Sequence, residues 1–73
     1  MREEYPKHWY EYECYDYHVL IRGFRWNYWV ITLSLNHYQI KALMFHCPSK
    51  RLAKKIGEKL LTKAIQYGWK PEF

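Results

Sequence analysis

The residues best suited to chemistry in this chain are cations and aromatic rings that lie close together. Five of them fall within seven consecutive positions: Arg22, Phe24, Arg25, Trp26 and Tyr28. Arginine binds phosphate or guanine edges, and aromatic rings stack on bases. This segment is expected to contain the loop between two strands. Because such loops usually carry small polar residues, an apolar and basic loop predicts contact with a partner. The alternative is that Phe24 and Trp26 fold back and close a small core.

A second basic group recurs at every fourth position further along the chain. It consists of Arg51, Lys55, Lys59 and Lys63, with Lys50 and Lys54 beside its start. In a helix this spacing forms a row along one flank, which can follow a line of phosphates. Lys50 and Arg51 would lie in the first turn, where the helix dipole disfavours cations by ~0.3–1 kcal/mol. That position indicates a bound anion, and the alternative is a solvated outer face.

Catalysis and metal binding have weak support in the sequence. His8, His18, His37 and Cys14 are scattered, and no CxxC or HxxxH pair occurs. No P-loop, GxGxxG or GxSxG motif is present. A Cys–His nucleophile at the adjacent His46 and Cys47 is formally open. We predict a protein that is not an enzyme and that has no metal and no cofactor.

Composition bounds the fold and the partners. With 73 residues there is room for one small domain, and three Phe, four Trp and eight Tyr supply large apolar surfaces for its core. The net charge of +5 is uneven, because residues 1–21 carry −3, residues 22–48 carry +3 and residues 49–73 carry +5. A basic second half indicates an anionic partner.

Features that the sequence lacks bear on the location of the protein and on its two cysteines. No apolar run approaches the ~20 residues that a membrane helix needs. The start of the chain is polar and acidic, unlike a signal peptide. We therefore expect a cytoplasmic protein with no membrane partner. Cys14 and Cys47 are too few for a disulfide framework, and whether they pair stays open.

An alternating apolar pattern over residues 15–45 predicts three antiparallel strands. The dipeptide Asn36-His37 fits a two-residue turn, since Asn tolerates positive φ. This turn pairs Leu35 with Tyr38, Leu33 with Ile40, Ile31 with Ala42 and Trp29 with Met44 on a core face. The outer face then carries Tyr28, Val30, Lys41, Leu43 and Phe45.

The earlier connection is expected to be a five-residue loop over 23–27. Ile21 then faces Trp29, Val19 faces Ile31 and Tyr17 faces Leu33, while His18, Leu20 and Arg22 lie on the outer face. Residues 9–17 also alternate in a strand-like way.

Beyond Pro48 the pattern becomes helical, with Ser49 as N-cap and Gly68 as the stop. Leu52, Ala53, Ile56, Leu60, Ala64 and Tyr67 share one side of this helix. Gly57 lies on that side, where it would let the helix approach the sheet closely.

The predicted fold is α+β: a three-stranded antiparallel β-meander with one C-terminal α-helix packed on one face, in the order β-β-β-α. A single domain spans residues 1–73, with a loose lead-in over 1–8, the sheet over 9–45, the helix over 49–67 and a tail over 68–73.

The predicted function is that of a small binding module, and nucleic acid is the first candidate partner. The predicted contacts are Arg22, Phe24, Arg25, Trp26, Tyr28, Lys41, Lys50, Arg51, Lys55 and Lys59. The alternative is a protein-interaction module, a small regulator or inhibitor that docks on a larger assembly. A homodimer through the exposed sheet face is also possible. The acidic, Tyr-rich start of the chain favours this alternative, because Glu3, Glu4, Glu11, Glu13 and Asp16 would repel phosphate if they shared a face with the cations.

Overall fold

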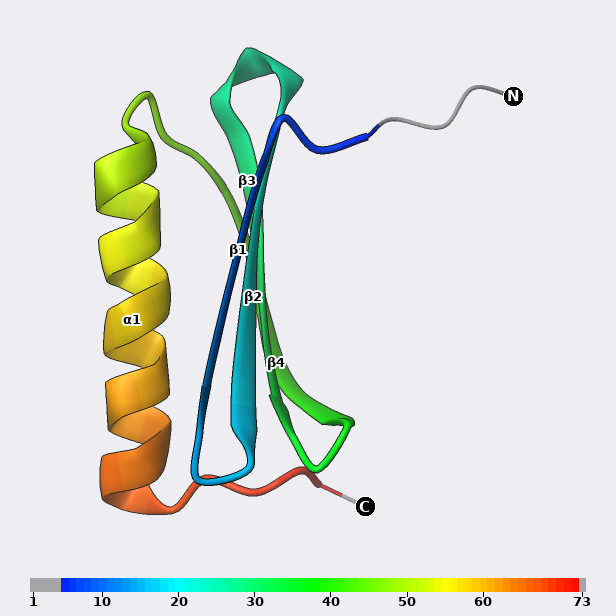
Figure 1. Cartoon of the computed structure of the whole chain (residues 1–73), viewed down its shortest axis with the longest axis vertical. Coiled ribbons are helices and arrows are strands. Elements are labelled where there is room, and N and C mark those ends of the chain that lie inside the picture. The colour runs from blue at the N-terminus through cyan, green and yellow to red at the C-terminus, as the bar shows by residue number, and fades with distance from the viewer. Residues whose placement is uncertain (1–4, 73) are drawn as a thin grey trace.

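A computed structural model describes residues 5–72 and shows one antiparallel sheet followed by one helix (Figure 1). The elements are β1 (His8–Cys14), β2 (Tyr17–Phe24), the 3-10 turn η1 (Arg25–Asn27), β3 (Tyr28–Leu35), β4 (Tyr38–His46) and α1 (Lys50–Tyr67). The sheet order is β1-β2-β3-β4, so each strand pairs with the next one in the chain. The α+β class is confirmed, but the sheet has four strands where three were predicted.

The extra strand comes from a tight turn that the alternation of residues 9–17 conceals. Tyr15 and Asp16 both have positive φ, 51° and 68°, and they reverse the chain so that Cys14 pairs with Tyr17. Asp accepts this left-handed conformation more readily than most residues do. Strand β1 therefore ends at Cys14, and its first residue, His8, belongs to the region that was expected to be a loose lead-in.

The link between β2 and β3 is shorter than predicted. Trp26 and Asn27 also have positive φ, so the chain reverses within three residues. The register consequently moves by two, and Ile21 pairs with Ile31 while Val19 pairs with Leu33. A shift of two residues leaves every side chain on the same face, so the predicted core face of these strands is confirmed.

The turn at Asn36-His37 is confirmed, with φ of 49° and 72° and Leu35 opposite Tyr38. A β-bulge follows, because Leu33 pairs with Lys41 and Ile40 is left without a partner in the ladder. One extra residue reverses the facing of the rest of β4.

The bulge makes part of the predicted outer face wrong. Leu43 and Phe45 pack against the core on the helix side, and Lys41 pairs with the buried Leu33. Ala42 and Met44 take the outward positions instead, where they pair with Thr32 and Val30.

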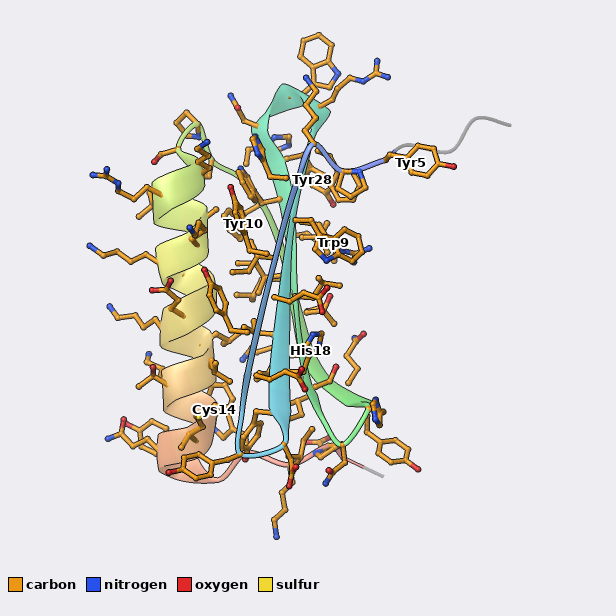
Figure 2. The ribbon with its side chains drawn as sticks, viewed as in Figure 1. Tyr5, Trp9, Tyr10, Cys14, His18 and Tyr28 are labelled. Atoms are coloured by element: carbon orange, nitrogen blue, oxygen red, sulfur yellow. The ribbon has the colours of Figure 1, made fainter. Side chains whose placement is uncertain are left out.

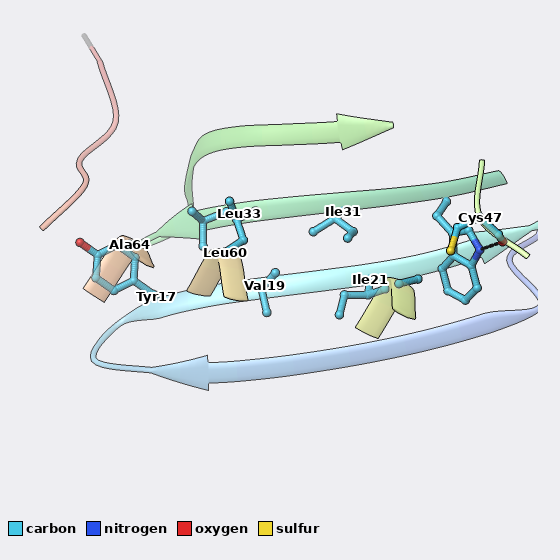
Figure 3. Close-up of a cluster of buried hydrophobic side chains, with 10 residues drawn as sticks. Tyr17, Val19, Ile21, Ile31, Leu33, Cys47, Leu60 and Ala64 are labelled. Carbon is cyan, nitrogen blue, oxygen red and sulfur yellow. Dashed lines mark hydrogen bonds between the residues drawn. The ribbon is translucent and has the colours of Figure 1, made fainter. Parts of the chain in front are cut away.

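The core lies between the sheet and α1 (Figure 3). Its buried apolar residues are Tyr17, Val19, Ile21, Trp29, Ile31, Leu33, Cys47, Ala53, Leu60 and Ala64. The predicted caps of α1 are confirmed, because the Leu52 N–H donates to Ser49 Oγ at 3.2 Å and Gly68 adopts φ of 63°. Two residues of the predicted apolar side of α1 do not pack against the sheet as expected, since Leu52 and Tyr67 are 50% and 65% exposed.

Gly57 provides the close approach that its position in the helix suggested. A Cβ at this site would overlap Ile21 Cδ1 and would lie 2.7 Å from Ile21 Cγ1. Ile21 is fully buried and has little room to yield. The absence of a side chain at Gly57 therefore decides how near α1 lies to β2.

We expect Gly57→Ala to lower the free energy of unfolding by about 1–2 kcal/mol. Overpacking costs ~1–3 kcal/mol, and Ala recovers up to ~1 kcal/mol of helix propensity. Urea unfolding of both single variants and of Gly57→Ala with Ile21→Val measures the coupling. Because Val lacks Cδ1, the double variant should be more stable than the sum of the two changes predicts. Stabilisation by Gly57→Ala would contradict the close contact.

Candidate binding surfaces

The molecule presents two surfaces on opposite sides of the sheet. Helix α1 covers one face, and the other face is bare in the described residues (Figure 1). In Figure 2, Trp9, His18 and Tyr28 project from the bare side, while Tyr10 points toward α1. We call the bare side the open sheet face, and the solvent side of α1 the helix outer face.

The half of the open sheet face nearest η1 is aromatic. Strand pairing places Phe24 beside Tyr28 and Tyr28 beside His46. The ring centroids of these two pairs are 6.3 and 5.2 Å apart. The Arg22 guanidinium lies 5.9 Å from the Phe24 ring centroid. Its Nε is shielded from solvent and has no hydrogen-bond partner among residues 5–72. This half can stack on flat groups and offers an unsatisfied cation.

The loop residues Arg25 and Trp26 lie at the end of the sheet, beside the start of α1. Trp26 is 82% exposed, so it does not fold back over the core. Its carbonyl lies 3.1 Å from His46 Nδ1, which ties the turn to β4. A shallow hollow at this end is lined by Lys7, His8, Phe24, Arg25, Trp26, Asn27, Trp29, Pro48 and Lys50. The fold therefore brings the predicted loop together with Lys50.

The opposite half of the open sheet face is acidic. Trp9 Nε1 donates to Glu11 Oε1 at 2.6 Å, and His18 Nε2 lies 2.9 Å from Glu11 Oε2. The indole hydrogen bond, and then the one from His18, hold the pKa of Glu11 below its usual 4.5. Glu13 and Asp16 follow towards the far turn, where they line a second shallow hollow. Glu11, Glu13 and Asp16 thus gather on this face, and Glu3 and Glu4 lie outside the described residues.

The helix outer face is strongly basic. Arg51, Lys55, Lys59 and Lys63 are all exposed, and the buried residues of α1 lie on its other side, at Ala53, Gly57, Leu60 and Ala64. Helix α1 carries six cations and one acid, Glu58, for a net charge of +5. Its first turn holds no acid and its last turn holds no base, so the cations oppose the helix dipole.

The ten predicted contact residues do not form one surface, because the sheet separates them. Arg22, Phe24 and Tyr28 lie on the open sheet face. Arg25, Trp26 and Lys50 lie at the end of the sheet, and Arg51, Lys55 and Lys59 lie on α1. Lys41 is apart from all of these, with its Nζ 5.3 Å from the Trp69 ring centroid on the helix side.

Sequence reasoning missed two residues of the open sheet face, Trp9 and Met44, which are 53% and 63% exposed. Trp9 lies on the strand that was not recognised as separate, although the alternation of residues 9–17 was its signal. Met44 faces outward only because of the bulge in β4, for which the sequence carries no clear sign.

Other kinds of site find little support in the described part of the chain. Within residues 5–72 no group of three or more His, Cys, Asp or Glu side chains is placed to hold a metal ion. Cys14 is exposed, Cys47 is buried, and neither is in a disulfide. None of the described helical residues forms a segment long and apolar enough to cross a bilayer.

Comparison with known proteins finds no matching family model, no matching curated protein and no matching solved structure.

Proposed function

We propose that this protein is a non-enzymatic module that binds nucleic acid through the phosphate backbone, using the helix outer face. The observation that carries the proposal is the separation of charge across the sheet. Helix α1 has a net charge of +5, whereas Glu11, Glu13 and Asp16 lie on the far side of the sheet. Phosphates that approach α1 therefore meet Glu58 as the one acid of this helix.

The dimensions of α1 suit a duplex. The row from Arg51 to Lys63 spans ~18 Å, about half a turn of DNA. A helix ~10–12 Å in diameter also fits a major groove ~12 Å wide. Lys50 and Arg25 continue the basic path past the start of α1, and the exposed Trp26 could stack on an unpaired base there.

The dependence of binding on salt tests the proposal. We expect anisotropy titrations with labelled 20-bp duplexes to give a slope of log Kobs against log salt of about −4.5 to −5.5, since five or six phosphates each contribute about −0.9. DNA and RNA duplexes of mixed sequence should be compared between 50 and 300 mM salt, with polyglutamate as a polyanion that lacks phosphate. Absence of binding at 50 mM salt, or equal binding to polyglutamate, would contradict the proposal.

The open sheet face favours a second function, protein binding. Its exposed Trp9 and Met44, with Tyr28 and Arg22, are residue types common at protein interfaces. Among its described residues the charge is mixed, since Lys7 and Arg22, with Arg25 beside them at the end of the sheet, oppose Glu11, Glu13 and Asp16. This surface suits a protein partner better than a polyanion.

We propose the cytoplasm as the location of both functions. Neither Cys14 nor Cys47 is in a disulfide, which suits a reducing compartment.

A further inference from the structure

The open sheet face carries a continuous band of side chains across all four strands. Strand pairing places Trp9 beside Arg22, Arg22 beside Val30 and Val30 beside Met44. Trp9 and Met44, at the two ends of this band, are more than half exposed. The band lies nearer to η1 than to the far turns, and Leu20, Phe24 and Tyr28 flank it.

Charge is distributed unequally on the two sides of this band. Towards η1 lie Lys7 and, at the end of the sheet, Arg25, and the described residues of the open sheet face there include no acid. Towards the far turns lie Glu11, then Glu13 and Asp16. The face is therefore basic at one end, apolar and aromatic in the middle, and acidic at the other end.

We propose that the open sheet face binds a second copy of this chain, face to face and with the strands of the two copies antiparallel. The two-fold axis lies across the strands and passes through the band from Trp9 to Met44. This inference rests on the second candidate function, protein binding, and is independent of phosphate binding by α1.

The antiparallel orientation is the one in which charges complement each other. A two-fold axis makes every contact occur twice, so a surface with a basic end and an acidic end is complementary to itself when the ends are exchanged. Lys7 and Arg25 then face the partner's Glu11 and the partner's Glu13. In the parallel alternative, the basic ends meet each other and the acidic ends meet each other, which is repulsive.

Arg22 supplies a second reason for a partner. Its Nε–H has no acceptor among residues 5–72, and a shielded donor without an acceptor costs free energy. The guanidinium leans from the band over Phe24, on the side that would meet the partner's Glu11. Rotation of this side chain towards that carboxylate would satisfy the donor.

The size of the face predicts how tightly the copies bind. Strands of eight residues at ~3.3 Å each and four strands at ~4.8 Å spacing give a face of roughly 500 Å². Two such faces bury roughly 1,000 Å², the lower end for a specific interface. We therefore expect a dimer with a micromolar dissociation constant, whose mass depends on protein concentration.

Sedimentation equilibrium of the full chain at 50 mM salt tests self-association. The mass should rise from 9.2 kDa at 1 μM towards twice that value at 500 μM. A mass that stays at 9.2 kDa throughout would overturn the proposal. If the mass stayed at 9.2 kDa and Trp9→Ala weakened duplex binding, nucleic acid and not a second copy would be the occupant of this face.

Charge reversal tests the orientation. One variant carries Glu11→Lys and Glu13→Lys, and the other carries Lys7→Glu and Arg25→Glu. Each alone should raise the dimer dissociation constant at least about 10-fold, and an equimolar mixture should form a heterodimer, which native mass spectrometry resolves. Circular dichroism confirms that each variant is folded.

The matched control is Glu58→Lys with Glu72→Lys, which changes the net charge by the same amount as the first variant but lies on α1 and in the C-terminal tail, outside the strands that form the face. It should leave the dimer constant within about 3-fold. A tighter homodimer of either reversed variant, or a mixture that stays monomeric, would overturn the antiparallel arrangement. Because the variant with Glu11→Lys and Glu13→Lys keeps Arg25 and the cations of α1, its duplex binding can succeed or fail independently of dimer formation.

Discussion

Replacing Arg51, Lys55, Lys59 and Lys63 with glutamine should weaken duplex binding by about 10³-fold at 0.1 M salt. Each cation that neutralises a phosphate contributes about 0.9 to the salt exponent, which is a factor of about 8 at this salt concentration. Four such factors multiply to more than 10³. The slope of log Kobs against log salt should fall by about 3 to 4 units in the same anisotropy titrations.

The fold should survive this change. Glutamine is as good a helix former as lysine or arginine, and removing like charges four residues apart relieves repulsion along α1. All four positions are exposed, so no buried contact is lost. Thermal unfolding of the variant should therefore show equal or greater stability at low salt.

The control is a variant with the same loss of charge elsewhere. Glutamine at Lys7, Arg22, Lys41 and Lys70 also brings the formal net charge from +5 to +1. The duplex affinity of this variant should fall by less than about 10²-fold, against about 10³-fold for the helix variant. Equal losses in the two variants would mean that overall charge, and not the helix outer face, attracts the nucleic acid.

Trp29→Ala should lower the free energy of unfolding by about 3–5 kcal/mol. Trp29 is 3% exposed, its Nε1 donates to the Cys47 carbonyl at 2.9 Å, and its ring stacks on His8 at 5.6 Å. It also fills the space over Gly23, where a Cβ would lie 2.7 Å from the indole. A domain of this size has a total stability of only about 4–11 kcal/mol, so the variant should lose between about a third and all of its stability.

Two further variants separate packing from hydrogen bonding. Trp29→Phe keeps most of the ring but leaves the buried Cys47 carbonyl without its donor, which should cost about 1–3 kcal/mol. Trp26→Ala is the matched control, because this indole is 82% exposed and should contribute within about 0.5 kcal/mol. Urea unfolding followed by circular dichroism measures all three. A Trp26 effect as large as that of Trp29 would contradict the described core.

The connection that Trp29 anchors also matters for both surfaces. The Cys47 carbonyl lies between the end of β4 and the start of α1, and the Cys47 N–H donates to the Asn27 carbonyl at 2.8 Å. These bonds join η1 to the segment that leads into α1. They explain why the basic loop and Lys50 share one end of the molecule.

Local residue types were enough to predict several features of the fold. Asn36 marked a turn, Ser49 and Gly68 marked the ends of α1, and Gly57 marked a close approach to the sheet. The alternation of Val19 and Ile21 identified the buried face. Each of these signals depends on neighbours in the chain, where the side chain determines the local backbone.

Two features of the sheet were not predicted from the sequence. The turn at Tyr15 and Asp16 interrupts an alternation that reads as continuous, and it produced the fourth strand. The bulge at Ile40 exchanged the faces of Leu43 and Met44. Side chains alternate between the two faces of a sheet, so one extra residue within a strand moves every following side chain of that strand to the opposite face.

By itself the sequence determined the class of the fold, the two buried strands, the limits of α1 and the types of residue available for binding. Only the tertiary structure decided that those binding residues divide between opposite sides of the sheet. Helix α1 must bury Ala53, Gly57, Leu60 and Ala64 against β2 and β3, so its cations turn away from the sheet. The antiparallel pairing of β1 with β2 then places Glu11 and Glu13 on the other side. Positions this far apart in the chain are related through packing, which no local pattern of residues expresses.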